Sequence, residues 1–180
     1  MDDRTVGQAV GPTLRTLDSF LSVVDTAKET SVPMKGSVWD VAEERVPGLG
    51  DIESRARDLR TELREWEEES KNLDRRLCEL ENETQAEDVD YEAVSRLFSD
   101  ALDSMERLDR QSERLERRLN EASEKSSEVA TKSVEIPVLG DRVRERLEEL
   151  SSGLSDTADE VRDLNRSPGD VIEVHTRAER

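Results

Sequence analysis

The sequence has few of the residues that build a thick hydrophobic core. Aromatic side chains make up only 3% of the 180 residues and hydrophobic side chains only 33%, whereas charged residues reach 40%. Burial of a wide, globule-like core is excluded by such a composition, because too little apolar surface can be removed from water. A slender helical assembly is therefore expected.

Residues that usually carry catalysis are equally scarce. The single histidine, His175, cannot form a histidine pair or a Ser-His-Asp set within one chain, and the single cysteine, Cys78, excludes an internal disulfide and a multi-cysteine metal site. Glycine-rich phosphate-binding loops are also missing. We expect a non-enzymatic protein with no cofactor, no metal and no small-molecule substrate, in which Cys78 is a partly exposed spectator thiol on the outer side of its helix.

Most of the basic residues are arginine rather than lysine, and acidic residues outnumber basic ones. Five lysines contribute to the 27 basic residues, which face 45 acidic ones for a net charge of −18. This composition resembles that of proteins from extreme halophiles, in which molar salt screens carboxylate repulsion within about 3 Å. The alternative is a dedicated polyanionic function. If the acidity is an adaptation to salt, a nucleic-acid partner is not expected but is not excluded by charge.

Signals for secretion or membrane insertion are missing as well. The first ten residues lack a basic segment followed by an apolar one, and no run approaches the roughly 20 apolar residues that span a bilayer. We expect a cytoplasmic protein.

Apolar residues recur alternately four and three positions apart in two long stretches. The first stripe predicts a helix over 51–86 with Asp51 as its N-cap, and the second predicts a helix over 91–132 with Asp88 or Asp90 as its N-cap. The second stripe is expected to begin at Tyr91. The larger side chains of the two stripes form the predicted core seam: Leu59, Leu63, Trp66, Leu73, Leu77, Leu80, Phe98, Met105, Leu108, Leu115 and Leu119.

A chain reversal near Val89 is favoured over one continuous rod, because Asp88 and Asp90 compete with the helix for backbone N–H groups. The fold class is then all-α, with a long antiparallel coiled-coil hairpin. Facing residue numbers sum to about 178 in this register, which places Trp66 opposite Ser112 and Leu80 opposite Phe98. The bulky indole then meets a small partner.

Two shorter amphipathic helices are predicted over 4–28 and 141–165. We expect them to pack as a small helical bundle at the base of the hairpin, which makes residues 1–165 a single elongated domain. The link 29–50 is irregular, with a short helix near Val38 that buries Trp39. The C-terminal stretch 166–180 is expected to be a flexible tail.

Two turns share one pattern, apolar-Pro-x-Leu-Gly-Asp, at 46–51 and 136–141. Each precedes a predicted helix, and both are expected at the end of the hairpin opposite its tip. A duplicated helical unit and a coincidence of two similar helix starts both explain the pattern.

These features favour a structural or interaction protein, a scaffold or adaptor that makes helix–helix contacts with a second copy of itself or with another protein. The hairpin would serve as a spacer or dimerisation arm. A second hypothesis is peripheral membrane association through the first helix. In the first hypothesis the base, including the first helix, binds a protein partner, and the expected partner face of that helix comprises Leu14, Leu17, Phe20, Leu21 and Val24. For membrane association the apolar face includes Phe20, Leu21, Val23 and Val24.

Overall fold

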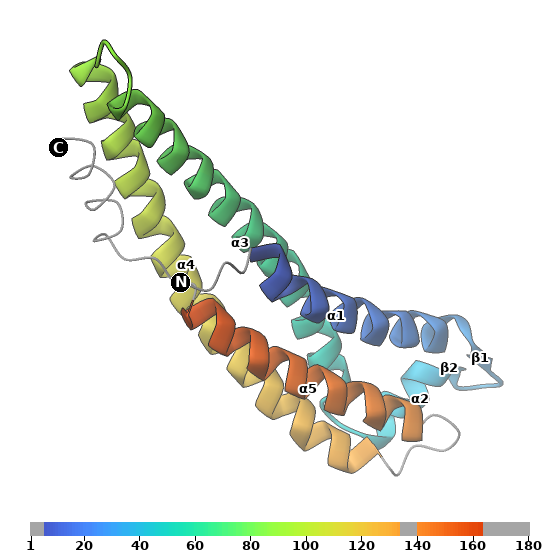
Figure 1. The fold of residues 1–180 in the computed structure, drawn as a ribbon. Coiled ribbons are helices and arrows are strands. Elements are labelled where there is room, and N and C mark those ends of the chain that lie inside the picture. The colour runs from blue at the N-terminus through green and yellow to red at the C-terminus, as the bar shows by residue number, and fades with distance from the viewer. Residues whose placement is uncertain (1–5, 134–139, 164–180) are drawn as a thin grey trace.

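The computed structural model describes residues 6–133 and 140–163 and has an all-α architecture (Figure 1). These residues form five helices and one short two-stranded hairpin. In chain order the elements are α1 (Val6–Glu29), β1 (Ser31–Val32), β2 (Gly36–Ser37), α2 (Val38–Arg45), α3 (Leu49–Thr84), α4 (Tyr91–Lys132) and α5 (Gly140–Asp163). The predicted helices agree with α1, α3, α4 and α5 within two residues at each described end.

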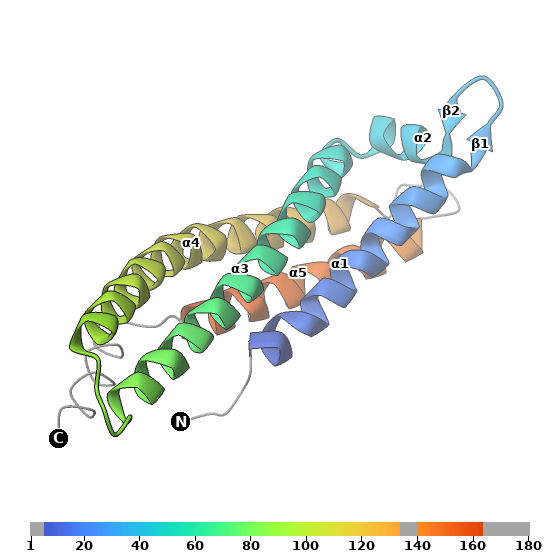
Figure 2. The same cartoon turned by 90° about the horizontal axis from the view of Figure 1, so that it is seen from above.

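The four long helices form an up-and-down bundle. α1 packs on α3 and α5, α3 packs on α4, and α4 packs on α5, so that the helices close a ring in which neighbours run antiparallel (Figures 1 and 2). α3 and α4 continue past the ends of α1 and α5. We call this two-helix extension, residues 71–84 and 91–111, the arm, and the four-helix part the base.

The register of the hairpin is fixed by a buried polar contact. The Trp66 indole Nε1 donates a hydrogen bond of 2.8 Å to Ser112 Oγ, and this hydroxyl in turn donates to the Leu108 carbonyl at 2.7 Å. Both side chains are buried, with 1% and 2% exposure. The predicted pairing of Trp66 with Ser112 is therefore confirmed, and it places the chain reversal between Gln85 and Asp90.

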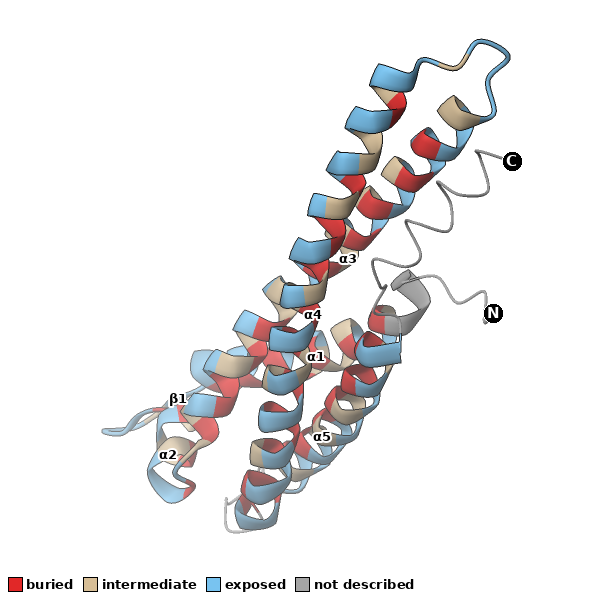
Figure 3. Cartoon of the chain, turned by 90° about the vertical axis from the view of Figure 1, so that its left-hand side faces the viewer, coloured by how far each residue is buried: buried red, intermediate tan, exposed pale blue. Residues whose placement is uncertain are grey.

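Burial along the hairpin follows the predicted stripes (Figure 3). Of the expected seam residues only Phe98 is not fully buried, and it packs at the edge of the core. Tyr91 was expected to begin the second stripe, but it is 81% exposed. As the first residue of α4 it lies at the arm tip, where no further turn of α3 extends to cover it.

Capping differs between the two hairpin helices. Asp90 caps α4 as expected, since its Oδ1 accepts from the backbone N–H groups of Glu92 and Ala93 at 3.0 and 3.2 Å. The prediction that Asp51 caps α3 is wrong. The helix begins two residues earlier, with Gly48 as its N-cap at φ 105°, a left-handed conformation that glycine adopts without a steric cost. Asp51 instead lies in the first turn and accepts from Arg55 at 2.8 Å.

The link between α1 and α3 is more regular than predicted. A tight antiparallel hairpin pairs Ser31 with Ser37 and Val32 with Gly36, and it leads into α2, which buries Trp39 as expected. Ser37 and Asp40 form a capping box at the start of α2. The two-residue strands are too short for the periodicity of the sequence to indicate them.

α5 is held against its neighbours by small polar side chains. Ser123 Oγ on α4 donates to the Ser151 carbonyl at 2.7 Å, and Ser151 Oγ donates to the Ser123 carbonyl at 2.8 Å. On the other side, Thr13 of α1 hydrogen-bonds to Thr157 Oγ1 and to the Gly153 carbonyl. Small residues allow the backbones to approach closely, and the hydroxyls satisfy one another where water is excluded.

An ion-pair network ties α1 to α3. Glu53 is 8% exposed and accepts from Lys28 and from Arg57, whose Nη2 also donates to Asp25 at 2.7 Å. The hydrogen bond to Asp25 raises the pKa of Arg57 above its ordinary value. A buried carboxylate requires such partners, because its desolvation is otherwise costly.

Some expectations fall outside the described residues. These are most of the second repeated turn (136–139), residues 4–5 and 164–165 of the flanking helices, and the tail 166–180 with His175.

Replacement of Ser112 by alanine is expected to destabilise the protein by about 1–3 kcal/mol, because the buried Trp66 N–H loses its acceptor. Denaturant unfolding followed by circular dichroism measures this change. The matched control is Ser152→Ala on the exposed face of α5, which should change stability by less than about 0.5 kcal/mol. Equal stability of the Ser112 variant and the wild type would contradict the described register.

Asp40 should stabilise the protein in a pH-dependent manner. Hydrogen bonds from the Ser37 backbone N–H and hydroxyl hold the pKa of Asp40 below its ordinary value of 3.8. Its contribution is therefore present above that ordinary value and lost as the pH falls through the lower folded value. Asp40→Asn should lower the Tm at neutral pH, and the difference from wild type should shrink below pH 3.8. The exposed Asp156→Asn serves as control, and a pH-independent difference for Asp40→Asn would count against the capping box.

Candidate functional site

The expected partner face of α1 lies inside the base rather than on the surface. Leu17, Phe20, Leu21 and Val24 are each at most 1% exposed, and Leu14 is partly buried. The reason is that α1 completes the bundle, and its apolar stripe packs against α2, α3 and α5. Both sequence-based hypotheses that used this face therefore lose their contact surface.

Large apolar side chains are rare on the described surface. Only Met34, at the tip of the β1–β2 hairpin, and Tyr91, at the tip of the arm, are strongly exposed, with 104% and 81% exposure. The β1–β2 hairpin and the arm tip lie at opposite ends of the described molecule (Figure 1), so these two side chains form no common patch. Isolated exposed side chains of this kind are normal on soluble proteins and do not define a site.

The described residues contain no cluster of three histidine, cysteine or acidic side chains arranged to hold a metal ion. Over the same residues, no helix combines the length and the apolar character needed to cross a membrane. Cys78 is exposed on the arm, as predicted.

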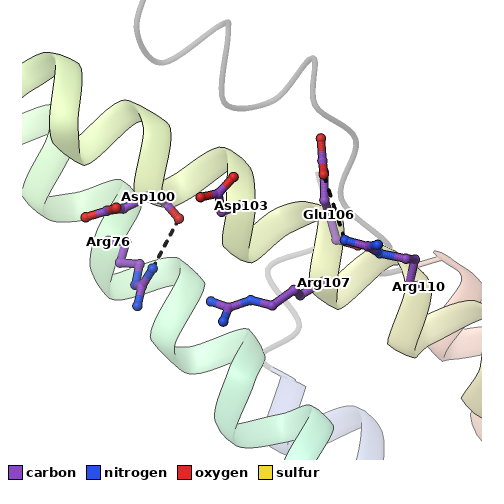
Figure 4. A pocket seen from close by; sticks show the side chains of 6 residues that line it. All are labelled: Arg76, Asp100, Asp103, Glu106, Arg107 and Arg110. Atoms are coloured by element: carbon purple, nitrogen blue, oxygen red, sulfur yellow. Dashed lines mark hydrogen bonds and ion pairs between the residues drawn. The ribbon is translucent and has the colours of Figure 1, made fainter.

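Charged side chains of α3 and α4 line a groove on the surface of the arm (Figure 4). It has a volume of about 440 Å³ and contains three bases and three acids. One of its residues belongs to α3 and the others to α4: Arg76, and Asp100, Asp103, Glu106, Arg107 and Arg110. We call these six residues the arm groove.

Two guanidinium groups of the arm groove converge on one buried hydroxyl. Ser104 Oγ, in a side chain with 0% exposure, accepts from Arg76 Nη1 at 2.7 Å and from Arg107 Nη2 at 3.2 Å. Arg76 Nη1 also donates to the Asp100 carbonyl at 3.1 Å. These acceptors are neutral, so two like charges are held close together, and among the described residues the one carboxylate within 4.0 Å of either guanidinium is Glu69, 3.7 Å from Arg107 Nη2.

The arginines of the groove differ from those of the base. Arg57 and Arg60 of the base each donate to a carboxylate of α1, at 2.7 and 3.1 Å, and Arg118 donates to Glu62. In the groove the shortest approaches to a carboxylate are 3.7 Å for Arg107 to Glu69 and 3.9 Å for Arg110 to Glu106.

Arg76 is the most unusual of them. Every other described arginine that is partly buried has a carboxylate oxygen within 4.0 Å, whereas no carboxylate of the described residues lies within 4.0 Å of Arg76. The groove therefore carries cationic groups that the described chain leaves without an acidic hydrogen-bond partner.

The groove is not apparent from the apolar spacing of the sequence. Arginines spaced three or four residues from acids on a helix can form intrahelical ion pairs, as Arg55 does with Asp51. The sequence signal for the groove is the order of charges along α4, with acids at 100, 103 and 106 followed by bases at 107 and 110.

Comparison with known proteins gave no match of the chain to a family model, to a curated protein or to a solved structure.

The exposed position of Cys78 predicts that this thiol reacts with a chromogenic disulfide reagent in the folded protein. One thiol per chain should react, at a rate within about tenfold of that in denaturant, since the side chain is accessible. Strong protection in the native state would show that the arm is covered at this point.

Proposed function

We propose that this chain is a non-enzymatic structural protein whose arm makes helix–helix contacts with a second copy of the chain. The base holds the arm at a fixed angle, and the arm supplies the contact surface. The observation that carries this proposal is the arm itself, since α3 and α4 continue beyond the two helices that complete the bundle.

An arm of two helices is an inefficient way to bury apolar surface. Two packed helices expose more surface per residue than four, so the arm adds less to stability than the same length would add within the base. Its seam is nevertheless closed, with Leu73, Leu80 and Ala101 at 0% exposure. A closed seam makes the arm stiff, which suits a spacer that presents one surface at a distance from the base.

The acidic surface is compatible with self-association in concentrated salt. Two chains that each carry a net charge of −18 repel one another over long distances in dilute buffer. At 1 M salt the screening length falls to about 3 Å, so the long-range repulsion disappears while direct contacts between charged groups persist in part. We accordingly propose a halophilic setting for the protein.

Contact through the arm, rather than through α1, is favoured by the burial pattern. The apolar stripe of α1 is used within the base, and the same burial removes the surface that membrane association through this helix would need. The outer surface of the arm remains accessible over the arm groove and Cys78.

The monomer has a mass of 20.4 kDa, and light scattering of the full chain in molar salt should give twice this mass. A spin label on Cys78, the only cysteine, should report a defined distance between labels of two copies by pulsed dipolar spectroscopy. The matched control is Cys78→Ser combined with Ser152→Cys, which moves the label to the base and should give longer distances. A monomeric mass without dipolar coupling at any salt concentration would refute the proposal.

A further inference from the structure

We propose that the arm groove is the contact surface between two copies, in which the three arginines of one copy pair with the three carboxylates of the other around a two-fold axis. This inference rests on the proposed function and assigns its contact residues.

The composition of the groove favours a copy of itself over other ligands. Three acids flank the arginines, so an anion with several charges, such as a phosphate group, meets repulsion as well as attraction. A basic peptide segment would likewise be attracted by the three acids but repelled by the three arginines. A surface that carries equal numbers of both charges is matched by an identical surface turned by 180°, which is the requirement of a two-fold interface.

The order of charges along α4 has the symmetry that such an axis needs. Asp103 lies two residues before Met105 and Arg107 two residues after it. In the same way, Asp100 lies five residues before Met105 and Arg110 five residues after it. Met105 itself is buried in the seam and only marks the level of the axis along the helix. Two antiparallel α4 helices that cross at this level bring the acid of each pair opposite the base of the other copy.

Arg76 completes the set from α3. Its guanidinium lies beside Ser104, one residue before the level of the axis, so the position opposite it belongs to Glu106 of the second copy. Each of the three bases then has one acid across the axis. The carboxylate would also relieve the repulsion between Arg76 and Arg107, which the neutral Ser104 hydroxyl does not compensate.

The geometry also predicts how the helices meet. Arg96 lies nine residues before Met105 and Arg114 nine residues after it, so two antiparallel α4 helices that stayed side by side along their length would bring these like charges together. Helices that cross at an angle separate these two residues and keep contact only near the axis. The contact is therefore small and dominated by charge, which corresponds to a reversible, salt-dependent association rather than an obligate dimer.

Charge reversal at the central pair tests the contact. Asp103→Arg alone and Arg107→Asp alone each oppose like charges twice across the axis and should weaken self-association by about tenfold or more. An equimolar mixture of the two single variants restores both pairs in a mixed dimer, and the double variant D103R/R107D restores them in its own homodimer. Sedimentation equilibrium across a salt series measures all four samples.

Matched controls separate this contact from a general effect of charge. Glu79→Arg and Arg75→Asp make the same charge changes at exposed arm positions outside the groove and should leave association unchanged within about twofold. Circular dichroism establishes that each variant is folded, which is expected because Asp103 and Arg107 are both exposed.

The outcomes distinguish this inference from the proposed function. A wild-type chain that remains monomeric refutes both. A wild-type dimer that persists in both single variants, or single variants that do not recombine when mixed, refutes the arm groove as the contact and leaves self-association through another surface of the arm.

Discussion

The structure depends on the antiparallel seam between α3 and α4, and the seam depends on its register. Leucine stripes alone permit neighbouring registers, because one leucine layer resembles the next and a slip of one turn preserves most apolar contacts. The Trp66–Ser112 hydrogen bond breaks this degeneracy. A slipped hairpin would bury the indole N–H without an acceptor and place the ring against a larger side chain. The position of the arm groove follows from the same register, since Arg76 and Ser104 meet only when α3 and α4 are aligned in this way.

The seam between α3 and α4 is covered differently in the base and in the arm. In the base, α1 and α5 cover the seam, and partly buried polar pairs such as Ser123 with Ser151 allow close packing. In the arm, two helices cover each other and leave their outer faces to solvent. Arg57 and Arg118 of the base donate hydrogen bonds to carboxylates of a neighbouring helix, whereas in the arm groove Arg107 approaches Glu69 of α3 only to 3.7 Å and Arg76 has no described carboxylate within 4.0 Å.

Much of this fold follows from the sequence, because a four-three spacing over five or more repeats has one simple structural solution. The hairpin, its turn and the pairing of Trp66 with Ser112 follow from that spacing together with the weak helix propensity around Asp90. The start of α3 was misplaced because a left-handed glycine cap, Gly48, carries no side-chain signal. The arm groove could not be predicted, since ion pairing depends on side-chain conformations and on which charges of neighbouring helices meet.

The most direct test of the seam is a nuclear Overhauser measurement from the Trp66 indole proton, assigned with the help of a Trp39→Phe variant. The described register predicts cross-peaks to Ser112 and Leu108 protons, because Ser112 Oγ is 2.8 Å from the indole nitrogen and itself bonds to the Leu108 carbonyl. Cross-peaks to the side chain of Met105 in place of Ser112 would show a slipped hairpin and contradict this account. An indole proton that exchanges with solvent as rapidly as an exposed one would contradict the closed seam altogether.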